Sequence, residues 1–84
     1  MANVEERIKS VTAKLLKIDT ESIKSDDNFS ADLGAESIQS IELVAMFEEE
    51  FGIDMDEEAA LAVDTVGKAA TFIEQVCQEQ GVDV

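Results

Sequence analysis

Ser37 is the residue whose type and position most suggest chemistry, because it lies in the run Asp-Leu-Gly-Ala-Glu-Ser-Ile at residues 32–38, where a helix is expected to begin. A serine becomes a nucleophile when a nearby base takes its proton, but the chain has no histidine and no lysine close to Ser37 in sequence. Two interpretations remain: Ser37 is the N-cap of the helix, or it is an acceptor that another enzyme modifies. A phosphate ester is favourable at such a position, since the free amides and the dipole of a helix N-terminus stabilise an anion.

Acidic residues are the second set that could bind a partner. The chain has 20 Asp and Glu against 6 Lys and Arg, a formal net charge of -14. Residues 25–67 contribute -13 of this charge and contain no basic side chain, whereas residues 1–24 carry +1. Because this charge repels phosphates and anionic lipids, we expect neither nucleic acid nor a membrane as partner. Residues 54–58 lack the glycine and terminal glutamate of a calcium-binding EF-hand loop, so we expect no dedicated metal site.

The length and the single thiol narrow the class of protein further. With 84 residues the chain is expected to form one domain over 1–84, with little room for both a core and an enclosed catalytic cleft. Cys77 is the only cysteine, which excludes an internal disulfide and a zinc cluster. No leader and no long apolar run are apparent. We therefore expect a non-enzymatic cytoplasmic protein.

Apolar residues recur at helical spacing, so the elements that position Ser37 are expected to be helices. The first helix is predicted over 4–17, with Asn3 and Glu6 as a capping box and an apolar stripe at Val4, Ile8, Val11, Leu15 and Ile18. Residues 18–36 are predicted as a long loop held by Phe29 and Leu33.

Three further helices are predicted beyond this loop. One spans 37–51 and ends at a left-handed Gly52, and a short helical turn follows over 57–62. The last helix starts after Asp64 or Thr65 and is closed by Gly81. Its predicted core residues are Val66, Ala69, Ala70, Ile73, Val76 and Cys77. The predicted fold is all-α, a four-helix bundle with three main helices and one short helix.

The helix over 37–51 has apolar residues on two sides. One side carries Leu43, Val44, Phe47 and Phe51, as expected for a core face. The opposite side carries Ile38, Ile41 and Ala45, flanked by Glu42, Glu48 and Glu49. An apolar strip beside carboxylates suits the docking of a basic partner, with loose packing against the long loop as the alternative.

These motifs resemble those of acyl carrier proteins, whose pattern is Asp-Leu-Gly-Ala-Asp-Ser-Leu followed by an acidic amphipathic helix. The resemblance covers about residues 2–77 and includes Glu5-Glu6-Arg7, Phe29 and Thr65-Val66. It implies an acyl-carrier-like four-helix bundle in which Ser37 carries 4'-phosphopantetheine, installed from coenzyme A by a phosphopantetheinyl transferase. The thiol of this group would hold acyl thioesters for synthases, reductases and transferases of fatty-acid or related lipid synthesis, and the carrier would act as a monomer.

Four positions depart from the family pattern: Glu36 replaces aspartate, Ile38 replaces leucine, Ala45 replaces a larger side chain, and Asp56 stands where proline is common. Glu36, Ile38 and Ala45 would lie where partner enzymes dock. A specialised carrier for polyketide, peptidyl or lipid-A pathways is therefore an alternative to a fatty-acid carrier. An acidic interaction module that is never modified is the alternative of a different class.

The carrier interpretation also predicts a cavity for the acyl chain. Burial of an eight-carbon chain is worth up to roughly 6 kcal/mol, so the core is expected to open between the second and third helices. The candidate lining residues are Leu43, Val44, Phe47, Met55, Ala60, Val63 and Ala69. Phe47 stands where aliphatic residues are frequent, and we expect it to limit how deeply long chains are held.

Overall fold

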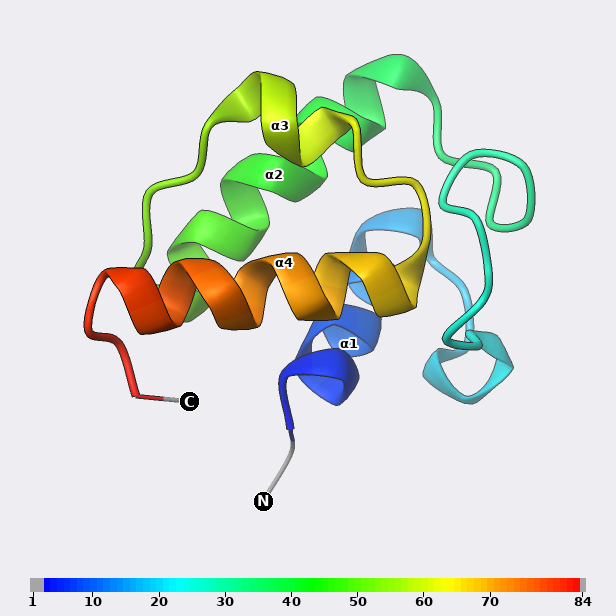
Figure 1. Ribbon diagram of the computed structural model, residues 1–84. Coiled ribbons are helices and arrows are strands. Elements are labelled where there is room, and N and C mark those ends of the chain that lie inside the picture. The colour runs from blue at the N-terminus through cyan, green and yellow to red at the C-terminus, as the bar shows by residue number, and fades with distance from the viewer. Residues whose placement is uncertain (1–2, 84) are drawn as a thin grey trace.

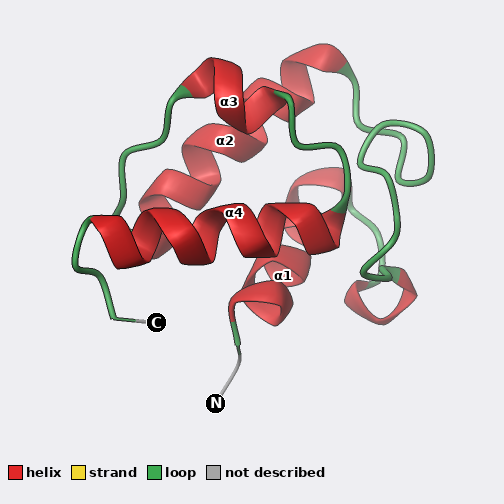
Figure 2. Ribbon diagram, viewed as in Figure 1, coloured by secondary structure: helices red, strands yellow, loops and turns green. Residues whose placement is uncertain are grey.

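The protein is described here by a computed structural model covering residues 3–83 (Figure 1). Its elements are α1 (Val4–Leu16), a 3-10 helix η1 (Thr20–Ser22), α2 (Ser37–Phe51), α3 (Glu57–Leu61) and α4 (Val66–Glu79). Figure 2 shows helices joined by loops, and no strand forms among residues 3–83. The predicted all-α fold, with three main helices and one short helix, is confirmed. None of the helices in this described part is long and apolar enough to cross a membrane.

Local signals set the ends of α1. The Asn3 side chain caps the helix by accepting a hydrogen bond from the Glu6 amide at 2.8 Å. The helix ends at Leu16, one residue earlier than predicted, because Lys17 adopts the left-handed conformation with φ 58°. Thr12 is fully buried although the apolar pattern did not predict it, and its hydroxyl donates to the carbonyl of Ile8 at 2.8 Å.

The other helices end close to the predicted positions. Gly52 closes α2 with φ 67°, and Gly81 follows α4 with φ 72°. The short α3 stops at Leu61, one residue before the predicted end. Thr65 is the N-cap of α4, where its side chain accepts from the Lys68 amide at 3.3 Å.

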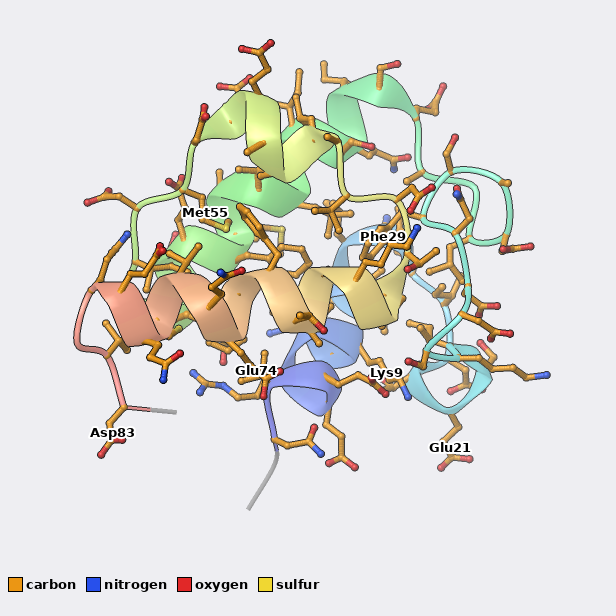
Figure 3. The ribbon with its side chains drawn as sticks, in the orientation of Figure 1. Lys9, Glu21, Phe29, Met55, Glu74 and Asp83 are labelled. Atoms are coloured by element: carbon orange, nitrogen blue, oxygen red, sulfur yellow. The ribbon has the colours of Figure 1, made fainter. Side chains whose placement is uncertain are left out.

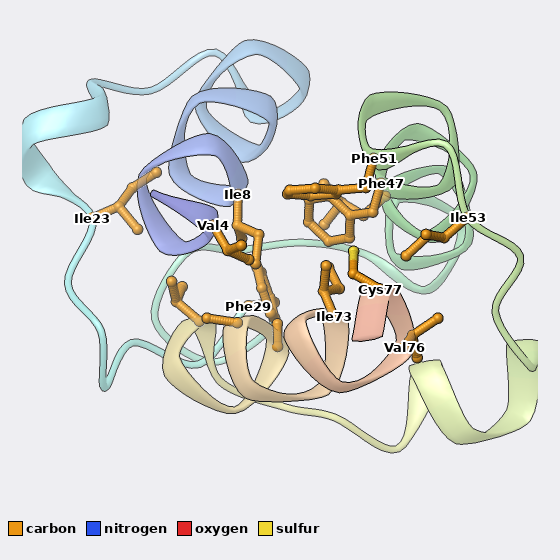
Figure 4. Close-up of a cluster of buried hydrophobic side chains, with 14 of the residues drawn as sticks. Val4, Ile8, Ile23, Phe29, Phe47, Phe51, Ile53, Ile73, Val76 and Cys77 are labelled. Atoms are coloured by element: carbon orange, nitrogen blue, oxygen red, sulfur yellow. The ribbon is translucent and has the colours of Figure 1, made fainter. Parts of the chain in front are cut away.

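The core lies between the three long helices, and α1 packs against both α2 and α4 (Figure 4). Every residue predicted for the core face of α2 or α4 is buried: Leu43, Val44, Phe47, Phe51, Val66, Ala69, Ala70, Ile73, Val76 and Cys77. Of the stripe predicted for the first helix, Val4 and Ile8 are buried, while Val11, Leu15 and Ile18, which follows the end of α1, are half-buried at the margin of the core. The short helix α3 packs against α2, and none of its residues is fully buried.

The long loop before α2 is fastened to the start of α4. Phe29 is buried and Leu33 half-buried, as predicted, and Ile23 and Ala35 are further buried anchors that the pattern did not reveal. The loop carbonyls of residues 25 and 27 accept hydrogen bonds from the first two amides of α4, at 2.7 and 3.1 Å. These bonds satisfy amide groups that a helix N-terminus otherwise leaves free.

Candidate functional site

Ser37 is the first residue of α2 and is exposed. The N-cap position belongs to Glu36, so the interpretation of Ser37 as the N-cap is wrong. The backbone amide of Glu36 donates to Oε1 of Gln39 at 2.9 Å, which fixes the first turn without using the serine. Within residues 3–83 the Ser37 hydroxyl forms no hydrogen bond. The hydroxyl is therefore accessible from solvent.

The loop that leads to Ser37 has a defined conformation. The Asp32 carboxylate accepts a hydrogen bond from the Asn28 amide at 2.7 Å, and the Asn28 side-chain oxygen accepts from the amides of Ser30 and Ala31. Gly34 follows with φ 77°, in the region that favours glycine, and the amide of buried Ala35 donates to the carbonyl of Phe29 at 2.8 Å. The Asp-Leu-Gly-Ala segment thus presents Ser37 at the surface from a fixed backbone.

Apolar and acidic side chains share the side of α2 that points away from the core. Ile38 is 68% exposed and Ile41 46% exposed, and Glu36, Glu42, Ala45 and Glu49 are exposed as well. We call these six residues the outer face of α2. A third large apolar residue that is exposed, Leu61 of α3, was not predicted and is 41% exposed. It lines the cavity described below.

Glu48 differs from the other acidic residues predicted for docking. It is half-buried, and its Oε2 atom accepts a hydrogen bond from the Met55 amide at 2.8 Å. Its carboxylate thus faces the connection between α2 and α3, so we do not count it in the outer face of α2.

A cavity of about 60 Å³ lies between α2, α3 and α4. All seven residues predicted for the chain pocket line it: Leu43, Val44, Phe47, Met55, Ala60, Val63 and Ala69. The long loop supplies Phe29, and α4 supplies Phe72 and Ile73, which the sequence did not single out. Figure 3 shows Met55 and Phe29 toward opposite ends of α4, and the Phe29 ring contacts that of Phe47 at a centroid distance of 6.4 Å. The walls are mostly apolar and suit an aliphatic chain.

Comparison with known proteins identifies the family of this site. A family model described as a phosphopantetheine attachment site matches residues 6–73. Two relatives are an acyl carrier protein of Sinorhizobium fredii (strain NBRC 101917 / NGR234) and the acyl carrier protein AcpP of Rhizobium meliloti (strain 1021). Each is 41% identical over 75 residues, which cover 89% of this chain and 96% of the relative. The chain belongs to the acyl carrier protein family.

Acyl carrier proteins carry phosphopantetheine, and the N-terminus of α2 fits the phosphodiester of this group. The amides of Ser37 and Ile38 lie in the first turn, where no carbonyl of the helix can accept from them. These amides and the helix dipole favour an anion at the Ser37 hydroxyl. The neighbouring carboxylate of Glu36 is exposed, so solvent and salt screen its repulsion.

The chain's own thiol cannot replace the thiol of the prosthetic group in this acyl carrier protein. Cys77 belongs to α4 and is fully buried in the core. Burial raises the pKa of the Cys77 thiol, and the positive charge of Arg7 only partly opposes this effect. A buried and protonated thiol is neither nucleophilic nor accessible to a partner enzyme.

Proposed function

We propose that Ser37 is the attachment site of 4'-phosphopantetheine and that residues 1–84 act as one carrier domain. The observation that carries this proposal is the exposed Ser37 hydroxyl, which forms no hydrogen bond with the described residues and lies at the N-terminus of α2. A phosphopantetheinyl transferase supplies the group from coenzyme A. The bound group provides a thiol that holds the acyl chain as a thioester, and the chain's own residues position it and receive the acyl chain.

Intact mass spectrometry tests the attachment site. We expect incubation with coenzyme A and a broad-specificity transferase to add one phosphopantetheine to the wild-type protein and none to Ser37→Ala. Ser30→Ala is the matched control, because Ser30 is also exposed and lies in the loop before α2. An unmodified wild-type protein would favour an acidic interaction module instead, and a modified Ser37→Ala protein would place the site elsewhere.

We propose that the outer face of α2 is where partner enzymes dock, with the transferase and the acyl-processing enzymes presenting basic patches to it. Exposed carboxylates at Glu42 and Glu49 raise the rate of encounter with such a patch, and Ile38 and Ile41 provide apolar contact area. Docking at this face brings an enzyme close to the arm on Ser37, which starts the same helix.

Charge reversal tests the docking face. The double change Glu42→Lys and Glu49→Lys is expected to lower the kcat/KM of the transferase by about tenfold or more at low salt, and less at high salt. Glu74→Lys with Glu79→Lys makes the same change in net charge on exposed residues of α4 and serves as the control. Equal effects of the two pairs would show that net charge, and not this face, governs docking.

The cavity between α2, α3 and α4 is proposed to receive the acyl chain and to shield it from water. We propose that the carrier works as a monomer in the cytoplasm, where the thiol of the arm stays reduced. We further propose that its acyl groups go to enzymes of fatty-acid or related lipid synthesis. The unusual residues Glu36, Ile38 and Ala45 lie on the outer face of α2, and they allow a specialised pathway as the alternative.

A further inference from the structure

The connection between α2 and α3, residues 52–56, is held by two side chains from other parts of the chain. Nε2 of Gln80 donates to the carbonyl of Asp54 at 2.6 Å, and the Asp54 amide donates back to Oε1 of Gln80 at 3.0 Å. Oε2 of Glu48, which belongs to α2, accepts from the Met55 amide at 2.8 Å. Gln80 follows the last residue of α4 and lies outside the region that the family model matches.

This pair of contacts fixes one wall of the cavity. Met55 lines the cavity, and the residue held by Gln80 is its direct neighbour. The helix that follows, α3, supplies Ala60 and Leu61 to the same cavity but buries none of its own residues. Since α3 has little packing of its own, its position depends on the backbone that leads into it.

We propose that Glu48 and Gln80 form a latch on residues 54 and 55 that controls how readily the cavity opens. Release of the latch frees Met55 and the start of α3 to move away from α2. The contacts of Gln80 are exposed and that of Glu48 is only partly buried, so water can replace them and the closed state is reversible. The role in chain exposure rests on the proposed function, whereas the latch itself does not.

Amide hydrogen exchange of the unacylated protein tests the latch alone. In Gln80→Ala we expect the amides of Asp54 and Met55 to exchange about tenfold faster, as for the loss of one or two net hydrogen bonds. The amide of Ile73, in the core, should keep its rate relative to the wild type. Gln78→Ala is the matched control, because Gln78 is exposed on α4 and forms no side-chain hydrogen bond with residues 3–83.

Variants of Glu48 separate hydrogen bonding from charge. Glu48→Ala should accelerate exchange of the Met55 amide by a similar factor, whereas Glu48→Gln keeps an acceptor oxygen and should stay close to the wild type. Unchanged exchange at residues 54 and 55 in Gln80→Ala, or an equal rise at these residues and at Ile73, would overturn the latch.

The octanoyl form tests the consequence for the cargo. We expect hydroxylamine to cleave the octanoyl thioester several-fold faster in Gln80→Ala than in Gln78→Ala. The acetyl thioester should be cleaved equally fast in both variants, because an acetyl group has only one methyl group to bury in the cavity. If the amides of residues 54 and 55 exchange faster but the octanoyl thioester is not cleaved faster, the latch does not control opening of the cavity. Absence of any thioester on Ser37 would instead count against the proposed function, and the exchange measurements would still decide the latch.

Discussion

An acyl chain on the prosthetic group is expected to raise the free energy of unfolding until it fills the cavity, and to raise it little thereafter. Each buried methylene contributes about 0.8 kcal/mol, because the unfolded protein leaves the chain in water. A cavity of about 150 Å³ holds a six-carbon ring, so by proportion the 60 Å³ found here holds about two or three carbons. The expected gain over a chain that stays in water is therefore roughly 2 kcal/mol, against roughly 6 kcal/mol for a fully buried octanoyl chain.

Urea unfolding of the acetyl, butanoyl, hexanoyl and octanoyl forms measures this gain. We expect the free energy of unfolding to rise from acetyl and to level off between butanoyl and hexanoyl. A longer chain must displace Phe47 and Phe29, whose rings contact each other at the cavity. Equal free energies for the four forms would show that the chain stays in water, and an unbroken rise to octanoyl would refute the limit set by cavity size.

The variant Phe47→Leu tests which side chain sets the limit. It should lower the stability of every form by on the order of 1–2 kcal/mol, because a buried ring is replaced by a smaller group. It should also move the plateau to longer chains. Ile8→Val is the control, because Ile8 is fully buried but does not line the cavity, so its cost should be independent of chain length. A plateau unchanged by Phe47→Leu would contradict the assignment.

Three further predictions concern the packing that supports the site. Gly67→Ala should lower the free energy of unfolding by about 1–3 kcal/mol despite alanine's higher helix propensity, since its Cβ would lie 2.6 Å from Oγ and 3.1 Å from the carbonyl oxygen of Ser25. Adding Ser25→Ala should recover part of this loss in urea unfolding, and a neutral Gly67→Ala would contradict the close contact. Arg7→Ala should lower the free energy of unfolding by about 1–2 kcal/mol, and Arg7→Lys should lower it less. The reason is that the guanidinium lies 4.4 Å from the ring centroid of Phe51 and hydrogen-bonds to Glu50 of α2. Equal stability of both variants and the wild type would contradict this prediction. Cys77 should resist thiol reagents at neutral pH. Because the pKa of the Cys77 thiol is raised in the folded state, its contribution to the free energy of unfolding is complete below the ordinary thiol pKa of about 8.5. This contribution is lost as the pH rises through the pKa of the folded state. Rapid labelling of the native protein would contradict that burial, and Cys77→Ala should lack this part of the pH dependence.

Helical periodicity and end signals predicted much of the fold because these are local properties. The stripes of α2 and α4 are all buried, and Asn3, Gly52 and Thr65 mark helix ends as their residue types indicate. The long loop was harder to predict, since η1 and the buried Ile23 and Ala35 depend on contacts with distant segments.

The candidate site shows the same division between local and distant information. The spacing along α2 correctly separated its exposed residues from its core residues. The spacing did not predict that Glu48 is half-buried, because its carboxylate accepts from the backbone amide of Met55, seven residues further along the chain. Likewise, helical spacing gives no indication of the contact between Gln80 and Asp54, which are 26 residues apart and meet only in the folded chain.

The mass of the group attached to the protein in its native host tests the central claim most directly. Protein purified from that host is digested, and the peptide that contains Ser37 is fragmented to locate the added mass. We predict one phosphopantetheine, free or acylated, on Ser37 and on no other residue. Absence of this group from the Ser37 peptide, in a host that attaches phosphopantetheine to other carrier proteins, would contradict the account. So would the group on a different serine.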